Sequence, residues 1–138
     1  MTRNGPDDAT RKGTSEAKAI EGLLAYALKR PRWGNSAIDY LTEAIARSRA
    51  LARESPGEHT ELLARCLRTA AKVLLKRRRA MEALPLAQEA VALTRARGGA
   101  PLVVSLHGLA AVLEALHRYS EAAAALAEAD GIPPPPDD

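Results

Sequence analysis

The stretch AAKVLLKRRRAMEALPLAQEA, residues 70–90, contains the end of one amphipathic helix, a charged corner and the beginning of a second helix. Alanine and leucine recur every three or four residues on both sides of the corner: Ala70, Ala71, Leu74, Ala83, Ala87 and Ala90. This spacing places them on one face of each helix. The stretch therefore predicts a helical hairpin whose two helices pack through small side chains.

The same apolar period continues on both sides of residues 70–90, and the residues that interrupt it divide the chain into helices. Pro31 and Gly34 interrupt it first, Gly98 and Gly99 interrupt it later, and Gly131 ends it. We expect helices at about 14–30, 35–54, 56–78, 81–97, 101–117 and 120–130. No strand is predicted. The fold class is therefore all-α with about six helices, and the short connections make successive helices antiparallel.

A capping box is predicted at the start of the third of these helices. Ser55 is placed to accept a hydrogen bond from the third helical amide, Pro56 occupies a position where no amide is needed, and Glu58 can reach back. Such a cap contributes about 1 kcal/mol to helix stability.

The two ends of the chain differ from its helical middle. Residues 1–13 contain Gly, Pro and Asp without an apolar period, and residues 131–138, GIPPPPDD, form a proline run that adopts an extended conformation. We expect a disordered N-terminal tail at 1–13, a single helical domain at 14–130 and a proline-rich C-terminal tail at 131–138. A chain of 138 residues has the length of one such domain.

Three hairpins match one another when Ala37, Ala83 and Ala122 are aligned, at offsets of 46 and 39 residues. Leucine or alanine then recurs at the other equivalent positions: Leu24, Ala70 and Leu109; Ala25, Ala71 and Ala110; Leu28, Leu74 and Leu113; Leu41, Ala87 and Leu126; Ala44, Ala90 and Ala129. The chain thus resembles the tetratricopeptide repeat (TPR) family, whose helix-turn-helix units carry small and large apolar residues in this order.

The resemblance covers residues 18 to about 134, nearly everything except the tails, and departs from the family in two respects. The units here are longer than those of the family, and its tryptophan position holds Glu21, Leu67 and Leu106. The structural alternative is a helical bundle without repeats, because Ala and Leu at this spacing occur in any bundle.

The resemblance implies that the first helix of each hairpin lines a concave groove, where members of the family bind peptide segments. On the helix at 56–78 and the residue that follows it, five basic residues fall within an arc of about 80° opposite the apolar face: Arg65, Arg68, Lys72, Lys76 and Arg79. We predict that this stripe is the basic centre of a groove. The alternative is a solvated polar face whose cations complement the helix dipole.

The equivalent positions on the neighbouring first helices are small or apolar, apart from Tyr26, Arg30 and His107. We predict that these three residues contact a bound segment, although a Tyr or His on a helix is also common as half-buried structure. A basic groove with small, uncharged walls suits an acidic or amphipathic segment of another protein. The predicted function is a non-enzymatic interaction scaffold or adaptor.

Trp33 and Leu126 indicate a second kind of contact. Trp33 lies in a turn among basic residues, where it either covers the end of its helix pair or anchors a partner. The helix at 120–130 lacks the polar outer face of a capping helix, so we expect Leu126 and its neighbours to meet the proline tail, another subunit or a further repeat. The alternative function is a regulatory or homo-oligomerisation module of a bacterial transcription-regulatory system.

Composition and residue spacing narrow the remaining classes of function and location. With a net charge of +3 and aromatic residues at only 3%, we expect no nucleic-acid partner, since little is available for stacking on bases. Cys66 and the histidines His59, His107 and His117 show no spacing for a metal site or a nucleophile, so we expect no enzyme activity, metal or cofactor. No apolar run reaches the roughly 18 residues of a membrane span, and the N-terminus lacks a signal-peptide pattern. We expect a soluble, cytoplasmic protein without a membrane partner.

Overall fold

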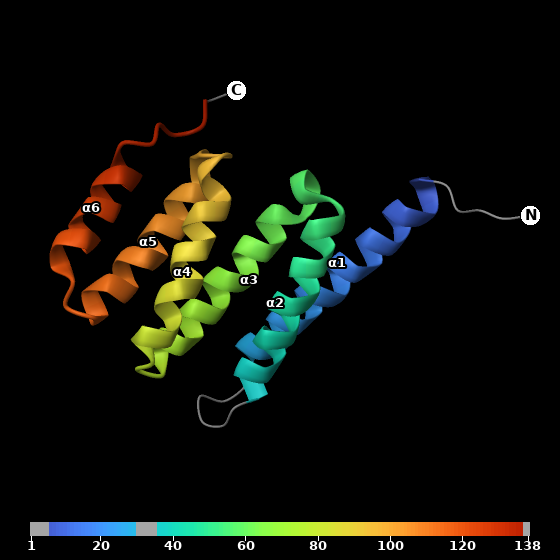
Figure 1. Ribbon diagram of the computed structural model, residues 1–138, viewed down its shortest axis with the longest axis horizontal. Helices are drawn as coiled ribbons and strands as arrows, with labels where there is room; N and C mark the ends of the chain where they lie inside the picture. Colours follow the sequence, from blue (N-terminus) through green and yellow to red (C-terminus); the bar gives the residue numbers. More distant parts are fainter. Residues whose placement is uncertain (1–5, 30–35, 137–138) are drawn as a thin grey trace, which may run out of the picture.

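The computed structural model describes residues 6–29 and 36–136, with side chains from residue 12 onward. This part of the chain contains six α-helices and no strand (Figure 1). The helices are α1 (Pro6–Leu28), α2 (Ser36–Glu54), α3 (Pro56–Lys76), α4 (Ala80–Arg95), α5 (Gly99–Ala115) and α6 (Tyr119–Asp130). The prediction of an all-α fold of about six antiparallel helices is confirmed.

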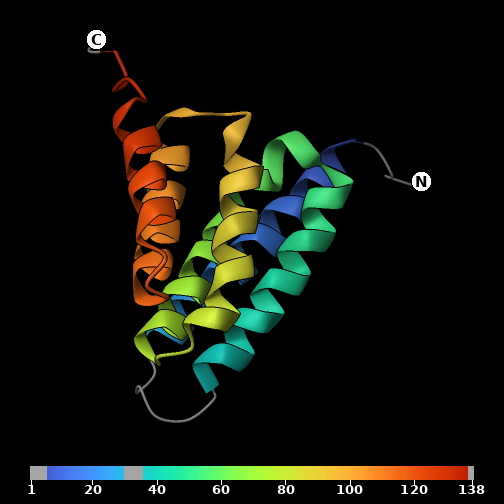
Figure 2. The same cartoon turned by 60° about the vertical axis from the view of Figure 1, so that its left-hand side comes forward.

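The helices form two layers (Figure 2). One layer contains α1, α3 and α5, which we call the odd layer, and the other contains α2, α4 and α6, the even layer. Each helix packs against its neighbours in the chain, and α3 also contacts α1 and α5 within the odd layer. The described helices of the even layer make no comparable contact with one another. The odd layer is therefore the more closely packed side of the stack.

Two ion pairs connect the even-layer helices across their wider spacing. Arg49 of α2 pairs with Glu89 of α4, and Arg95 of α4 pairs with Glu128 of α6. In both cases the two terminal guanidinium nitrogens bond to both carboxylate oxygens. These hydrogen bonds raise the pKa of Arg49 and of Arg95 above the usual arginine value. Both arginines thus tie helices together.

Alanine and leucine form most of the core. Ala44, Ala83 and Ala90 are completely buried, which lets the helix backbones approach closely. Most residues that align between the three hairpins are buried: Leu24, Leu41, Ala70, Ala71, Leu74, Ala87, Ala110, Leu113, Ala122 and Ala129, together with Ala37 and the three alanines above. Ala25 and Leu28 are exceptions, since both are exposed and the neighbouring Ala27 is buried instead. The end of α1 therefore turns a different set of positions toward the core than α3 and α5 do.

The second and third hairpins turn in the same way. Arg78 and His117 both have positive φ angles, 62° and 60°, and are 39 residues apart, which is the offset of the sequence alignment. The same backbone hydrogen bond closes each turn: Arg79 N to Leu74 O at 2.9 Å, and Arg118 N to Leu113 O at 2.8 Å. This bond is typical of a helix that ends through a left-handed residue. The two hairpins are structural copies of one another, including their turns.

Side chains repeat in these turns as well. Arg79 and Arg118 are the N-cap residues of α4 and α6, and each pairs with the Glu three residues later at 2.6 Å. This pairing lowers the pKa of Glu82 and of Glu121. The structure thus corrects the expectation that the helix at 56–78 continues to Arg78: α3 ends at Lys76, and Arg77, Arg78 and Arg79 form the turn before α4.

The expected N-terminal tail is shorter than predicted. Residues 6–13 form the beginning of α1, contrary to the prediction of a tail over residues 1–13. Pro6 suits the first helical position because it has no amide to leave unpaired. Gly13 lies beside His59 of α3, where a Cβ atom would be 3.5 Å from its Nε2, so a tertiary contact supports this part of the helix. At the other end, Ile132 packs against the core and residues 133–136 have no regular structure.

The capping box predicted at the start of α3 does not form. Ser55 is the N-cap residue, but its side chain makes no capping hydrogen bond. Its carbonyl oxygen accepts instead from the amides of Glu58 and His59, both at 3.1 Å, and its own amide donates to Leu51 O at 3.0 Å. Only this residue separates α2 from α3, so the backbones of both helices hold it. Pro56 does occupy the first helical position, as predicted.

Candidate functional site

The predicted groove positions that the structure describes lie on the odd layer, and all but Arg68 are exposed. We call the exposed set the odd-helix face: Ala19, Gly22 and Tyr26 of α1; Arg65, Lys72 and Lys76 of α3; and Val104, His107, Ala111 and Ala115 of α5. Arg30 lies outside the described residues. Arg79, the fifth predicted member of the basic stripe, is not on α3 but in the turn, where it pairs with Glu82. The structure gives the other four cations different roles.

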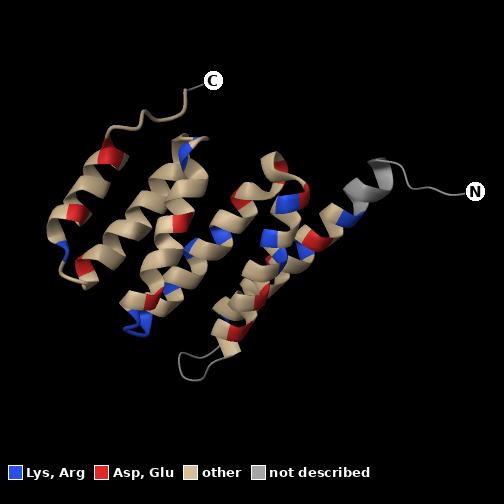
Figure 3. Ribbon diagram, viewed as in Figure 1, with Lys and Arg blue, Asp and Glu red and all other residues tan. Residues whose placement is uncertain are grey.

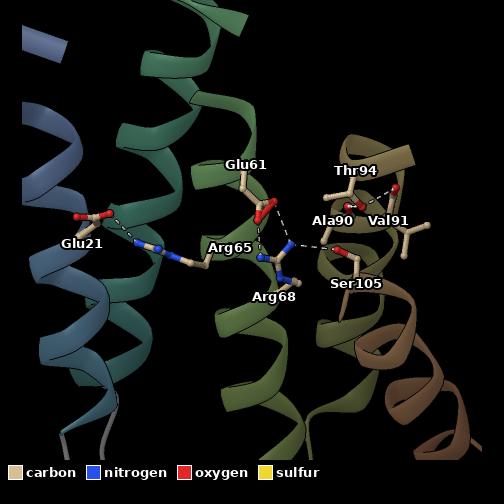
Figure 4. A network of polar contacts seen from close by, with 8 residues as sticks. All are labelled: Glu21, Glu61, Arg65, Arg68, Ala90, Val91, Thr94 and Ser105. Atoms are coloured by element: carbon tan, nitrogen blue, oxygen red, sulfur yellow. Dashed lines mark hydrogen bonds and ion pairs between the residues drawn. The ribbon is translucent and has the colours of Figure 1, made fainter. Parts of the chain in front are cut away.

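Arg65 is paired with an acidic residue of the neighbouring helix. Its Nη2 lies 3.1 Å from Oε2 of Glu21 on α1, and both side chains are about half exposed. The pair connects α3 to α1 across the odd layer (Figure 4). The positive charge of Arg65 is therefore already balanced by Glu21 within the fold.

Arg68 is the centre of a polar network between α3 and α5 (Figure 4). Its guanidinium donates to both carboxylate oxygens of Glu61, at 3.3 and 2.9 Å, and to the Oγ of Ser105 at 3.1 Å. The Arg68 side chain is only 15% exposed. Its position on α3 is turned toward α5, so the side chain lies in the contact between the helices. Arg68 thus holds the fold together, and the prediction that it serves as an open cation for a partner is not supported by its geometry.

Lys72 and Lys76 differ from both arginines. They are exposed, and neither makes an ion pair with any residue in the described part of the chain. They lie in the second half of α3, where the negative end of the helix dipole favours a positive charge. The available positive charge of the predicted stripe is therefore concentrated at its C-terminal end.

The exposed surface of α5 carries almost no charge. Glu114 is the one charged residue between Gly99 and Ala115, and α5 is nearly free of colour in Figure 3. Val104 is 54% exposed, and His107, Gly108, Ala111 and Ala115 are exposed as well. Because α5 packs directly against α3, this uncharged surface of mostly small residues adjoins the helix that carries Lys72 and Lys76.

Tyr26 borders the same layer on α1. Its ring meets that of Tyr40 on α2 edge to face, with ring centroids 4.8 Å apart and planes at 84°. The side chain is nevertheless 47% exposed. Packing against α2 therefore orients the ring, while about half of the side chain stays exposed.

The second predicted contact surface changes in detail. Leu126 packs against the core and is only partly exposed, so it does not form the outer face of α6 as expected. The apolar side of α6 turns toward α5, which is the one described helix whose backbone packs closely against it, and the Arg95–Glu128 ion pair links α6 to α4. The outer face carries small, uncharged residues: Ser120, Ala123, Ala124 and Ala127. Trp33 lies outside the described residues.

Two parts of this site were not predicted from the sequence. Glu61 and Ser105, which hold Arg68, were absent from the predicted set. Ser105 is 1% exposed and occupies the position equivalent to Cys66 in the preceding hairpin. The signal was a polar residue at a core position of the most apolar helix. Such a residue needs a hydrogen-bond partner, and Arg68 supplies it.

The described residues contain no group of three or more His, Cys, Asp or Glu side chains arranged to hold a metal ion. Cys66 is completely buried, and its burial raises the pKa of the thiol, which disfavours the reactive thiolate at neutral pH. In the same ranges, every helix is too short or too polar to cross a bilayer.

Comparison with known proteins does not assign the chain to a family. A scan against protein-family models, a search of curated proteins and a search of solved structures each found no match. The functional proposals therefore rest on the geometry and charge of this chain.

Proposed function

We propose that the chain is a non-enzymatic interaction module, a scaffold or adaptor that binds an acidic, amphipathic segment of another protein on the odd-helix face. One observation carries the proposal. Lys72 and Lys76, which have no ion-pair partner among the described residues, lie on the helix that adjoins the uncharged surface of α5. We further propose that it acts in the cytoplasm, on the sequence grounds already given.

The two parts of this face select different features of a ligand. Acidic side chains of a bound segment would pair with the two lysines. Both lysines are exposed, and neither has to give up an ion pair with a described residue. Apolar side chains would cover Val104 and Ala111, a part of α5 where binding buries no charged group. A helix with an acidic edge and an apolar edge meets both demands, as in grooves that bind amphipathic helices.

The resemblance to the tetratricopeptide repeat family supports the same class of function. In that family the first helix of each pair lines the binding surface, and the residues named here lie on α3 and α5. Because Arg65 and Arg68 are already paired within the fold, we assign recognition of the partner's negative charge to Lys72 and Lys76. The two arginines maintain the surface.

A peptide titration tests the proposal. The probe is a fluorescein-labelled helical peptide with leucine on one face and glutamate on the next, followed by fluorescence anisotropy at two salt concentrations. We expect the Lys72→Glu, Lys76→Glu double variant to bind about tenfold or more weakly, because both charges become repulsive. The same peptide with lysine in place of glutamate should not bind.

The control variant is Arg53→Glu, Arg97→Glu, which changes net charge by the same amount at exposed positions of α2 and of the α4–α5 turn. It should retain affinity within about twofold. Equal losses in the two double variants would show that the peptide responds to total charge, and would remove the odd-helix face from the proposal.

The outer face of α6 favours a second candidate function, homo-oligomerisation of a bacterial regulatory protein. Its four small residues carry no charge, and among the described helices α6 packs closely against α5 alone, apart from its ion pair with α4. Light scattering across a concentration series tests this idea with Ala124→Arg, which charges the outer face without entering the core. Leu126 is unsuitable for this purpose because it packs inward. A monomer at every concentration in the unmodified protein would exclude the candidate.

A further inference from the structure

A cleft separate from the odd-helix face lies where the first three helices meet. Its volume is about 640 Å³, and its walls come from α1 near Gly13, from the last part of α2, and from the first turn of α3. Leu51 and Ala50 supply apolar wall, while Glu54, Glu58 and His59 supply polar wall. The close approach of Gly13 to His59 places α1 along one side.

His59 is the unusual member of this wall. Its side chain is only 10% exposed, and its imidazole makes no hydrogen bond to any described residue. Oε2 of Glu58 is the nearest carboxylate oxygen to its Nε2, at 3.8 Å, which exceeds a hydrogen-bond distance. A neutral imidazole has one donor and one acceptor nitrogen. No fully buried side-chain nitrogen or oxygen in the described chain lacks a hydrogen-bond partner, so solvent reaches the ring nitrogens of His59. A molecule in the cleft can take the place of that solvent as their partner.

The charges of the wall indicate the class of that molecule. Arg47 and Glu16 neutralise one another through hydrogen bonds of 2.8 and 2.6 Å, and Arg47 also bonds to Glu43 at 3.2 Å. The remaining carboxylates, Glu54 and Glu58, have no lysine or arginine partner in the described chain. Lys12 is the remaining cation of the wall. The unbalanced charge of the cleft is therefore negative.

We propose that this cleft binds a small organic cation with an aliphatic body, of the primary-amine class. The ammonium group would pair with Glu54 and Glu58, donate a hydrogen bond to the free imidazole nitrogen of His59, and lay its aliphatic chain on Leu51. The geometry joins three features of the described residues: a cavity, a largely buried imidazole that makes no hydrogen bond to any of them, and two carboxylates without a lysine or arginine partner among them. This site shares no residue with the odd-helix face.

Nuclear magnetic resonance of the histidine rings tests the proposal on the full chain. The probe is 1,5-diaminopentane, compared with neutral 1,5-pentanediol and anionic glutarate at equal ionic strength and pH. We expect a saturable shift of the His59 ring signals with the diamine alone. His107 and His117 are exposed and distant in the chain, so their signals serve as internal controls. No saturable shift, equal shifts of all three histidines, or an equal response to the diol would overturn the proposal.

Variants of the two carboxylates provide the second arm. Glu54→Gln, Glu58→Gln preserves side-chain size at exposed positions and should weaken diamine binding about tenfold. Glu114→Gln, a control on α5, should leave it unchanged. If the Glu54, Glu58 variant binds as well as the unmodified protein, the proposed cation site is wrong. The Lys72 and Lys76 peptide experiment has a separate readout, so either proposal can fail alone.

The amine can be a free metabolite or a lysine side chain of another protein. Nα-acetyl-lysine methylamide therefore serves as a second probe beside the diamine. Binding of either compound to His59 supports the cation site, and the tighter of the two identifies the source.

Discussion

Arg68 of α3 donates a hydrogen bond of 3.1 Å to the Oγ of Ser105 on α5, and the same guanidinium is held by Glu61. This contact joins α3 and α5 through two residues that are 37 positions apart in the sequence. It also explains why a basic stripe that looks continuous on a helical wheel is not continuous as a binding surface. One of its members belongs to the interior of the odd layer.

The first prediction compares the two arginines of α3. Arg68→Ala should lower the free energy of unfolding by about 1–2 kcal/mol, because it leaves Glu61 and Ser105 without their partner in a partly buried site. Arg65→Ala should cost less than about 1 kcal/mol, since the Arg65–Glu21 pair is exposed. Urea unfolding followed by circular dichroism measures both. Equal costs would contradict the distinct roles assigned to these residues.

The second prediction concerns the close packing of α3 against α4. Ala90 is completely buried against Leu63 and Leu67 of α3. Ala90→Leu adds volume where none is available and should destabilise the protein by about 1–3 kcal/mol. Ala92→Leu, at an exposed position of the same helix, should change stability by no more than about 0.5 kcal/mol. Thermal unfolding of both variants checks the prediction, and similar melting temperatures would argue against the tight contact.

The third prediction uses the left-handed residues of the two equivalent turns. A side chain at positive φ costs about 1–2 kcal/mol that glycine avoids, although glycine loses more entropy on folding. Arg78→Gly should therefore stabilise the protein by about 0.5–1 kcal/mol. His117→Gly should gain less, because the His117 ring stacks on Tyr119 with centroids 5.7 Å apart.

A matched control for the turn variants is Ala96→Gly. Ala96 has an ordinary φ of −65°, so glycine there brings only its entropic cost of about 0.5–1 kcal/mol. Opposite signs for Arg78→Gly and Ala96→Gly in chemical unfolding would agree with the turn geometry. Destabilisation by Arg78→Gly would contradict it.

The fourth prediction concerns Cys66. Burial raises the pKa of its thiol in the folded protein, so the unfolded chain ionises first as the pH rises. The corresponding stability is present below the usual thiol value of 9.0 and is lost as the pH rises from there toward the folded pKa. Unfolding of the unmodified protein and of Cys66→Ala should therefore be compared at neutral pH and above pH 9. The unmodified protein should lose more stability over this range than Cys66→Ala.

Reactivity gives an independent measure of the same thiol. Iodoacetamide should modify Cys66 much more slowly in the native protein than in urea, because the sulfur is completely buried. Rapid modification under native conditions would show that the space between α2 and α3 opens readily, and would undermine the pH prediction as well.

Local sequence patterns were sufficient for much of this fold. The alanine and leucine spacing in residues 70–90 predicted the hairpin of α3 and α4, and Gly98, Gly99 and Gly131 marked helix ends correctly to within a few residues. These features depend on backbone preferences and on one apolar face per helix, which a single helix already displays. The grouping of the groove positions on α1, α3 and α5 rests on the same periodicity, and the binding of a partner there stays a prediction.

Contacts between helices could not be predicted in this way. The extension of α1 to Pro6 goes with the approach of Gly13 to His59, and the absent side-chain cap at Ser55 reflects the one-residue connection between α2 and α3. Likewise, the inward position of Leu126 follows from packing on α5. Each depends on residues distant in the chain or on the path between two helices.

The sequence by itself determined the six helices, their alternation and the alanine-rich interfaces, because helical periodicity and helix-ending residues act over one or two turns. Only the tertiary structure decided which charges remain available. Glu21, Glu61 and Ser105 engage Arg65 and Arg68, leaving Lys72 and Lys76 without an ion pair in the described chain. Hydrogen bonds and ion pairs require atoms within about 3 Å, and that proximity comes from how the helices stack.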